Sequence, residues 1–161
     1  MTGPDTETAW VQAVESEQAV AELAARFASA VQTPAVIYLR GDLGAGKTTF
    51  ARAYIHSLGF PGYVKSPSYG LLETYTAGGQ TILHLDLYRI EDPEELEFLA
   101  IRDLFDQESV LLVEWPDQGK HYLPAPDLVL DFDEKDEVRF VSCHVVSVRG
   151  RKLAAEVSQA I

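Results

Sequence analysis

A glycine-rich stretch constrains the fold of this chain more than any other feature. Residues Gly41-Asp42-Leu43-Gly44-Ala45-Gly46-Lys47-Thr48 match the phosphate-binding pattern G-x-x-x-x-G-K-[ST]. Glycines let consecutive backbone N–H groups converge on a phosphate, and a helix that begins there adds the positive end of its dipole. An apolar run at 35–39 precedes the motif, and a helical pattern at 49–58 follows it. This strand-turn-helix context predicts nucleotide binding.

The composition is that of an acidic globular protein. Apolar residues make up 47% of the chain, and no run approaches the roughly 20 apolar residues that a membrane helix needs. A length of 161 residues suits one domain spanning 1–161, in which we expect residues 1–12 to be flexible. The first residues lack the basic opening and apolar core of a signal peptide, which predicts a cytoplasmic location. The single cysteine, Cys143, lies in an apolar alternation and is predicted to be buried.

The charge balance bears on the kind of partner. The formal net charge is −12, from 25 acidic and 13 basic side chains, and no basic tract offsets it. Affinity for nucleic acid depends largely on Lys and Arg neutralising backbone phosphates. We therefore expect no direct DNA contact, and RNA held only indirectly, through a partner protein.

The order of elements predicts the fold class. Strands alternate with helices around the glycine-rich loop, and runs at 70–75 and 80–87 flank the hairpin turn Ala77-Gly78-Gly79. We predict an α/β, P-loop NTPase-like three-layer domain with a mixed, largely parallel central sheet and added antiparallel strands. Helices are expected at 16–31, 49–58, from Asp92 onward and at the C-terminus, and further strands at 35–39, 109–113, 127–132 and 137–148.

Roles in phosphate chemistry follow from position. Lys47 is predicted to reach the β and γ phosphates, Thr48 to bind Mg²⁺ and Thr49 to touch the α phosphate of ATP. Asp86 and Glu114 each end an apolar run, where a side chain emerges from the core towards a metal. One is expected to bind Mg²⁺ and the other to orient or deprotonate water, and the sequence leaves open which does which.

Three further features have competing interpretations. Ser66-Pro67-Ser68 is either a switch segment that senses the γ phosphate or a plain loop with a turn-forming proline. Trp115 is either a core residue or part of the site rim, next to Glu114. His84, on an apolar strand with no second metal ligand at suitable spacing, is predicted to be a core or strand-face histidine.

Five motifs in order resemble the TsaE family, also called YjeE, over residues 16–124. They are Gly41 to Thr49, Ser66-Pro67-Ser68-Tyr69, His84-Leu85-Asp86-Leu87-Tyr88-Arg89, Asp92-Pro93-Glu94-Glu95-Leu96 and Glu114-Trp115-Pro116. The resemblance implies an ATPase that acts with the proteins TsaD and TsaB in threonylcarbamoylation of adenosine 37 of tRNA.

The resemblance also implies roles for individual residues. It assigns Lys47 and Thr48 to phosphate and Mg²⁺, Glu114 and Asp86 to metal and hydrolysis, and Ser68 to a metal-sensing hydroxyl. It places Ser16 and Glu17 near the adenine. The family usually has Thr at the position of Ser68 and Gly at that of Ala100. Serine keeps the hydroxyl, whereas Ala100 adds a Cβ near an expected helix bend.

Two other functions remain open from the residues alone. A small-molecule kinase uses the same loop, but it usually needs a lid with arginines, and only Arg89 and Arg102 lie between the switch segment and Trp115. A nucleotide-gated binding module would use ATP to order a docking surface and hydrolysis to reset it. A GTPase is disfavoured because no Asn-Lys-x-Asp-like motif follows Glu114.

Overall fold

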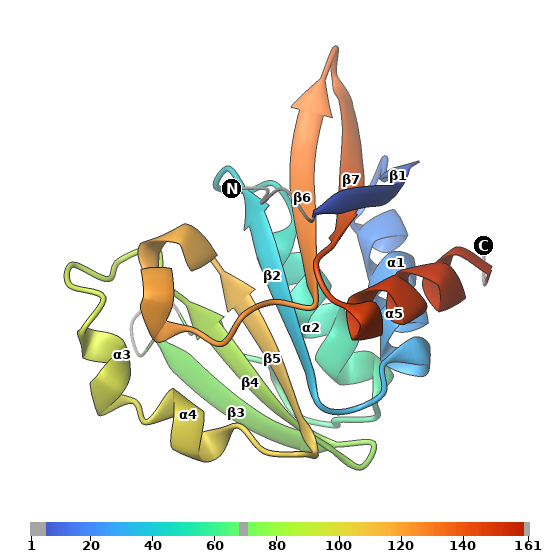
Figure 1. Cartoon of the computed structure of the whole chain (residues 1–161). Coiled ribbons are helices and arrows are strands. Elements are labelled where there is room, and N and C mark those ends of the chain that lie inside the picture. Colours follow the sequence, from blue (N-terminus) through green and yellow to red (C-terminus); the bar gives the residue numbers. More distant parts are fainter. Residues whose placement is uncertain (1–5, 68–70, 160–161) are drawn as a thin grey trace.

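The computed structural model describes residues 6–67 and 71–159, in which seven strands form one mixed sheet in the order β1-β7-β6-β2-β5-β4-β3 (Figure 1). The strands are β1 (Glu7–Ala13), β2 (Ala35–Gly41), β3 (Leu72–Ala77), β4 (Gln80–Asp86), β5 (Ser109–Glu114), β6 (Leu128–Lys135) and β7 (Val138–Val145). The helices are α1 (Glu17–Ala30), α2 (Lys47–Ser57), α3 (Glu95–Phe98), α4 (Ile101–Leu104) and α5 (Val148–Gln159), with 3-10 turns η1 (Pro116–Gln118) and η2 (Lys120–Tyr122).

The centre of the sheet is parallel. β2 pairs in parallel with both β5 and β6, and β4 pairs in parallel with β5. Every residue of β5 is buried, as expected for a central strand covered on both faces. Antiparallel pairs β3–β4, β6–β7 and β1–β7 extend the sheet outward. The predicted α/β class with a mixed sheet, parallel at its centre, is confirmed.

Each face of the sheet has its own apolar core. The longer helices α1, α2 and α5 pack on one face, with fully buried Phe27, Phe50 and Tyr54 among the largest core residues. Leu96 of α3 and Ile101 of α4 belong to a smaller core on the opposite face, and Figure 1 shows these two short helices well apart from α1 and α5. No helix within residues 6–67 and 71–159 combines the length and apolar character that a bilayer crossing needs.

Helix α1 and the hairpin β3–β4 form as predicted. The Ser16 hydroxyl accepts a hydrogen bond from the Ala19 amide at 3.1 Å, so Ser16 is the N-cap. Ala77 pairs with Gln80, which leaves Gly78 and Gly79 as a two-residue turn. Both glycines have positive φ, as this tight turn requires.

The second hairpin corrects one predicted turn. The charged stretch 133–136 was expected to join the two strands, but β6 continues and Lys135 pairs with Val138. The turn is instead Asp136-Glu137, with φ of 53° and 66°. A two-residue hairpin turn needs positive φ at both positions, and Asp tolerates that conformation better than most residues. The chain after Val145 also leaves the sheet earlier than predicted, because α5 already begins at Val148.

The expectation of a flexible segment at residues 1–12 is wrong from Glu7 onward. Residues Glu7–Ala13 form β1, an edge strand paired antiparallel with β7. Trp10 anchors the strand, since its ring lies 6.1 Å from that of Phe27 and its indole N–H donates to the Ala154 carbonyl at 3.1 Å. These contacts join segments far apart in the sequence, so local composition did not indicate them.

The helix predicted from Asp92 onward also differs from the structure. The Asp92 carboxylate accepts a hydrogen bond from the Glu94 amide at 3.0 Å, and helical residues begin only at Glu95. The helix then divides into α3 and α4 around Ala100, whose φ of 53° and ψ of 40° are left-handed. A left-handed residue interrupts helical hydrogen bonding, so the segment is two single turns rather than one helix.

Candidate functional site

Three central strands end at the same edge of the sheet. Gly41 ends β2, Glu114 ends β5 and Asp86 ends β4. Glu114 is the register partner of Leu39 on one side and of Asp86 on the other. Because neighbouring parallel strands present their carboxyl ends together, these residues are brought to one edge, which is where open α/β sheets bind ligands.

The glycine-rich loop joins β2 to α2 at this edge. Gly44 and Gly46 have φ of 78° and 116°, a conformation that side chains rarely adopt. Gly41 lies so close to β6 that a Cβ there would be 2.6 Å from the Phe132 carbonyl oxygen. Gly46 is the N-cap of α2 and supplies no side chain to cap the helix. The first amides of α2 therefore keep their capacity to bind an anion.

Lys47 is a buried cation at this edge. Its ammonium group donates hydrogen bonds to the carbonyl oxygens of Gly41 and, at 2.9 Å, Asp42, and it lies 4.2 Å from the centre of the Trp115 ring. Burial lowers the pKa of Lys47, and the charges of Glu114, Asp86 and Asp42 act against that lowering. A buried cation favours a negatively charged ligand, and the acidic groups around it favour a cation bound together with that ligand.

Glu114 is buried and held by two side chains. The Thr48 hydroxyl donates to Oε1 at 2.7 Å, and Nε2 of His84 lies 2.7 Å from Oε2. Thr48 comes from the first turn of α2 and His84 from β4, so two elements meet at this carboxylate. The pairing of Thr48 with Glu114 joins the end of the phosphate-binding motif to the strand-terminal acid.

Asp86 and an aromatic pair complete this edge. Asp86 is also buried, and its Oδ1 accepts a hydrogen bond from the Tyr88 amide at 3.0 Å. The rings of Tyr88 and Trp115 lie 4.9 Å apart. Trp115 has a φ of 57°, unusual for a bulky residue, and this left-handed turn directly follows Glu114. Both interpretations of Trp115 describe part of its position, because it lines the cavity at this edge and also packs, partly buried, against the smaller core.

A cavity of about 490 Å³ opens at this edge. Its lining includes most of the predicted nucleotide-binding and metal-binding residues, and also Trp115 and two residues that were given no role, Tyr88 and Arg89. The full lining is Glu17, Leu43, Gly44, Gly46, Lys47, Thr48, Thr49, Asp86, Tyr88, Arg89, Glu114 and Trp115. Of the predicted residues, Ser16 caps α1 and is not in the lining, and Ala45 packs against the core. Gly41 and Asp42 line a separate hollow that also contacts Trp115. Ser68 lies outside the described residues.

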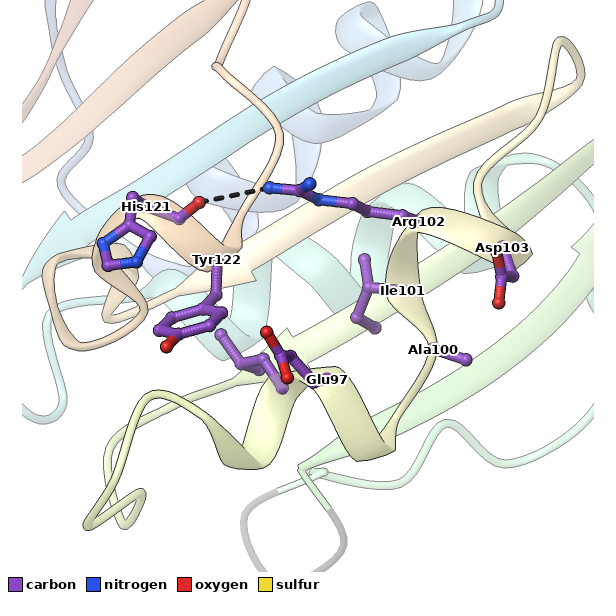
Figure 2. A pocket seen from close by; sticks show the side chains of 8 residues that line it. Glu97, Ala100, Ile101, Arg102, Asp103, His121 and Tyr122 are labelled. Atoms are coloured by element: carbon purple, nitrogen blue, oxygen red, sulfur yellow. Dashed lines mark hydrogen bonds between the residues drawn. The ribbon is translucent and has the colours of Figure 1, made fainter.

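A second cavity, of about 390 Å³, lies by α3, α4 and η2, away from the predicted residues (Figure 2). Figure 2 shows the side chains of Tyr122, Glu97 and Ile101 among those that line this cavity. Arg102 donates a hydrogen bond to the His121 carbonyl at 3.3 Å. The predicted phosphate-binding and metal-binding residues line the cavity at the strand ends and are absent from this second lining. The cavity at the strand ends is therefore the better candidate.

The donor set at the strand ends fits a nucleotide with Mg²⁺. Uncapped amides, glycines and Lys47 suit phosphate, while the Thr48 hydroxyl and the Asp86 and Glu114 carboxylates are the hard oxygen donors that Mg²⁺ prefers. In the described part of the chain, no three His, Cys, Asp or Glu side chains are grouped to hold a metal by themselves. That is expected where Mg²⁺ is bound by one or two carboxylates together with substrate phosphates.

Comparison with known proteins decides the family. The model of the family described as "Threonylcarbamoyl adenosine biosynthesis protein TsaE" matches residues 14–141. The chain belongs to the TsaE family. This match contains every predicted site residue, from Ser16 to Glu114. The suspected resemblance is confirmed, and with it a role in the biosynthesis of threonylcarbamoyladenosine in tRNA.

Individual TsaE proteins match over most of their length. The chain is 43% identical to the tRNA threonylcarbamoyladenosine biosynthesis protein TsaE of Haemophilus influenzae over 123 residues, which are 76% of this chain and 78% of that protein. Identity to the TsaE protein of Bacillus subtilis is 35% over 146 residues, 90% of this chain and 89% of that protein. The crystal structure of Bacillus subtilis YdiB superposes with a TM-score of 0.81 at 25% identity and covers 96% of this chain and 97% of YdiB.

Two features of this TsaE site were missed from sequence. His84 was predicted to be a core or strand-face histidine, and it is fully buried, but it also contacts Glu114. Tyr88 and Arg89 were given no role and line the cavity. One signal for His84 was present: alternate residues of a strand share a face, so His84 lies on the same face of β4 as Asp86.

Proposed function

We propose that this protein is an ATPase that binds ATP with Mg²⁺ and hydrolyses it. The phosphates would occupy the glycine-rich loop and the first turn of α2, where amides and Lys47 converge. The adenine would lie towards the start of α1, because Glu17 is in the cavity lining together with Leu43 and Thr49.

The observation that carries this proposal is the hydrogen bond of 2.7 Å between Thr48 and Glu114. It brings the hydroxyl of the phosphate-binding motif to a buried acid on a neighbouring strand. Proteins that bind a triphosphate and Mg²⁺ with this type of loop hold the metal with the loop hydroxyl and a strand-terminal carboxylate. A phosphate-binding loop without such an acid would bind an anion but would lack a protein carboxylate for the metal.

Each residue has a chemical task in this proposal. The loop amides and Lys47 hold and orient the phosphates, and Lys47 offsets their charge. Thr48 and one of the two carboxylates, Glu114 or Asp86, would hold Mg²⁺, which when bound supplies positive charge against the β and γ phosphates. Whichever of Glu114 and Asp86 is not occupied by the metal can accept a proton from the attacking water. Trp115 and Tyr88 limit solvent access on one side of the cavity.

We further propose that ATP turnover serves tRNA modification in a complex with TsaB and TsaD. The net charge of −12 favours docking on a protein over gripping RNA. In this arrangement the chain contacts tRNA only indirectly, and the threonylcarbamoylation of adenosine 37 is carried out on its partners.

Two variants test the ATPase proposal. Lys47→Ala removes the cation from the phosphate site, so binding or turnover of ATP should be lost. Glu114→Gln keeps the shape of the side chain but removes its charge, so the maximal rate of phosphate release should fall at least about 10²-fold while ATP stays bound. Glu108→Gln is the matched control, because Glu108 is exposed and precedes the opposite end of β5.

The readouts are phosphate release and ATP affinity, measured with the protein alone. Unchanged ATP affinity and hydrolysis in Lys47→Ala would remove the site assignment. Undiminished hydrolysis in Glu114→Gln would move the principal role to Asp86. Phosphate released to water without an added acceptor distinguishes a hydrolase from a small-molecule kinase, whereas phosphate transfer only to a metabolite would reject the ATPase proposal.

A further inference from the structure

His84 is a fully buried side chain at the site that the proposed function does not use. It lies on β4, two residues before Asp86, and its Nε2 is 2.7 Å from Oε2 of Glu114. It is absent from the lining of the cavity at the strand ends. His84 therefore contacts Glu114 from behind and is not placed to touch a ligand in that cavity.

The Glu114 carboxylate is fixed by one donor on each oxygen. Thr48 donates to Oε1 from the cavity side, and His84 holds Oε2 from inside the sheet. The terminal torsion of a glutamate is broad and only weakly restricted by its own rotamers. Without a partner on Oε2, the carboxylate could rotate and change which lone pairs face the cavity. A buried hydrogen bond from a rigid strand removes that freedom.

The surroundings of the ring determine its tautomer. In the described part of the chain, Nδ1 of His84 is buried without a hydrogen-bond partner. A neutral imidazole has one N–H and one acceptor nitrogen. A hydrogen on Nδ1 would leave a buried donor unpaired and set a lone pair against the carboxylate oxygen, and both are costly. A hydrogen on Nε2 leaves only an acceptor unpaired and gives Glu114 a donor.

We propose that His84 is a positioning residue for Glu114, and that its Nε2–H fixes the carboxylate so that Oε1 faces Thr48 and the cavity. The effect on turnover rests on the proposed ATPase function, whereas the hydrogen bond and the tautomer do not. Second-layer donors of this kind typically change metal affinity or activity by about 10- to 100-fold when removed.

A pair of substitutions separates positioning from packing. His84→Gln can place an amide N–H near the position of Nε2, whereas His84→Leu fills similar space without a donor. We expect His84→Leu to lower the maximal rate of ATP hydrolysis about 10-fold or more with ATP affinity within about threefold, and His84→Gln to recover most of that rate. An equal loss of hydrolysis rate in His84→Leu and His84→Gln, at the same melting temperature, would overturn the proposal.

The Glu114→Ala background provides the second test. If His84 acts through Glu114, His84→Leu should have little further effect on single-turnover hydrolysis in that background. If His84→Leu lowers the rate of hydrolysis by the same factor in Glu114→Ala as in the wild type, His84 acts by another route and the proposal is rejected. This comparison does not depend on how either substitution changes global stability, provided that both proteins remain folded.

A measurement without ATP tests the hydrogen bond directly. In protein with ¹⁵N-labelled histidine, we expect the His84 ring to be the Nε2–H tautomer and its signals to shift in Glu114→Ala, with exposed His121 as an unshifted reference. The Nδ1–H tautomer, or no shift in the variant, would overturn the inference. If the wild type releases no phosphate but the tautomer is as expected, the proposed function fails and the pairing of His84 with Glu114 stands.

Discussion

Ala100 has a backbone conformation that suits glycine better than alanine. Its φ of 53° and ψ of 40° are left-handed, which costs a residue with a Cβ about 1–2 kcal/mol. The substitution Ala100→Gly removes that cost, although glycine also gains freedom in the unfolded chain. We expect a net gain of about 1 kcal/mol and a melting temperature about 2–4 °C higher, measured by thermal unfolding.

The matched control is Ala155→Gly. Ala155 is also exposed but lies within α5, where glycine is about 1 kcal/mol less favourable than alanine. The two substitutions make the same chemical change and should move the melting temperature in opposite directions. A lower melting temperature in both would show that strain at Ala100 is not the deciding factor.

At the scale of single residues, the sequence predicted those roles that depend on residues nearby in the chain. The phosphate loop was identifiable because its glycines, Lys47 and Thr48 are consecutive, and Ser16 because an N-cap acts within one turn. The contact of His84 with Glu114 spans 30 residues and needs the register of β4 on β5. No local pattern encodes that register, so the role of His84 became visible only in the folded sheet.

A row of polar side chains links four strands on one face of the sheet. Arg40 on β2 donates two hydrogen bonds to Asp131 on β6, at 2.7 and 2.9 Å. His144 on β7 lies 2.9 Å from Asp131, and its other ring nitrogen is 2.9 Å from the Thr8 hydroxyl on β1. The row ties the outer strands to the strand that holds the phosphate loop.

This row predicts a loss of stability in acid. Burial raises the pKa of Asp131, but the hydrogen bonds and charge of Arg40, together with His144, outweigh it and hold the pKa below its usual value. A depressed carboxyl pKa stabilises the fold above the unfolded-state value of about 3.9, and that contribution is lost as the pH falls through the folded-state pKa. The wild type should therefore lose its stability advantage over Asp131→Asn as the pH falls from about 5 to below the folded-state pKa of Asp131.

Chemical denaturation at several pH values measures this effect. The control Asp133→Asn changes an exposed residue on the same strand and should follow the wild type closely across that range. A stability difference between wild type and Asp131→Asn that does not change with pH would contradict the expectation.

Helix α5 packs so closely against the residue that precedes β6 that there is no room for a side chain at Gly150. An ideal Cβ there would lie 1.9 Å from the Asp127 carbonyl oxygen. Asp127 cannot move freely, because its carboxylate accepts hydrogen bonds from the Val36 amide at 2.9 Å and the Ser147 hydroxyl at 2.6 Å. Gly150→Ala should destabilise the fold by about 1–3 kcal/mol, detected as a lower denaturant midpoint.

Ser158→Ala serves as the control for Gly150→Ala. Ser158 is exposed in the same helix, so its loss should change the midpoint little. A normal midpoint for Gly150→Ala would mean that α5 can shift away from Asp127 without cost.

At the scale of elements, the long segments with strong patterns were predicted and the weakly patterned ones were not. Strands β2 and β5 were found because buried parallel strands are continuous apolar runs. Strand β1 was missed because its sequence mixes polar and apolar residues and its pairing partner, β7, lies at the other end of the chain. The division between α3 and α4 was missed because it depends on one left-handed residue.

For the molecule as a whole, the net charge of −12 and the proposed nucleotide site together predict regulated docking. If nucleotide changes the docking surface, recovery of TsaB and TsaD with this protein should differ between a non-hydrolysable ATP analogue and ADP. Lys47→Ala is the control, because it should make recovery insensitive to nucleotide. Equal recovery of the wild type under both conditions would argue against nucleotide-gated assembly.

The position of β2 has a consequence for synthesis on the ribosome. The strand that carries the phosphate loop has β5 on one side and β6 on the other, and both follow it by more than 65 residues. A nascent chain that has emerged only as far as α2 contains the whole glycine motif but neither of the two strands that pair with β2. Under the proposed function, competence to capture ATP would arrive late in translation, and an incomplete chain would not compete for the nucleotide with the finished protein.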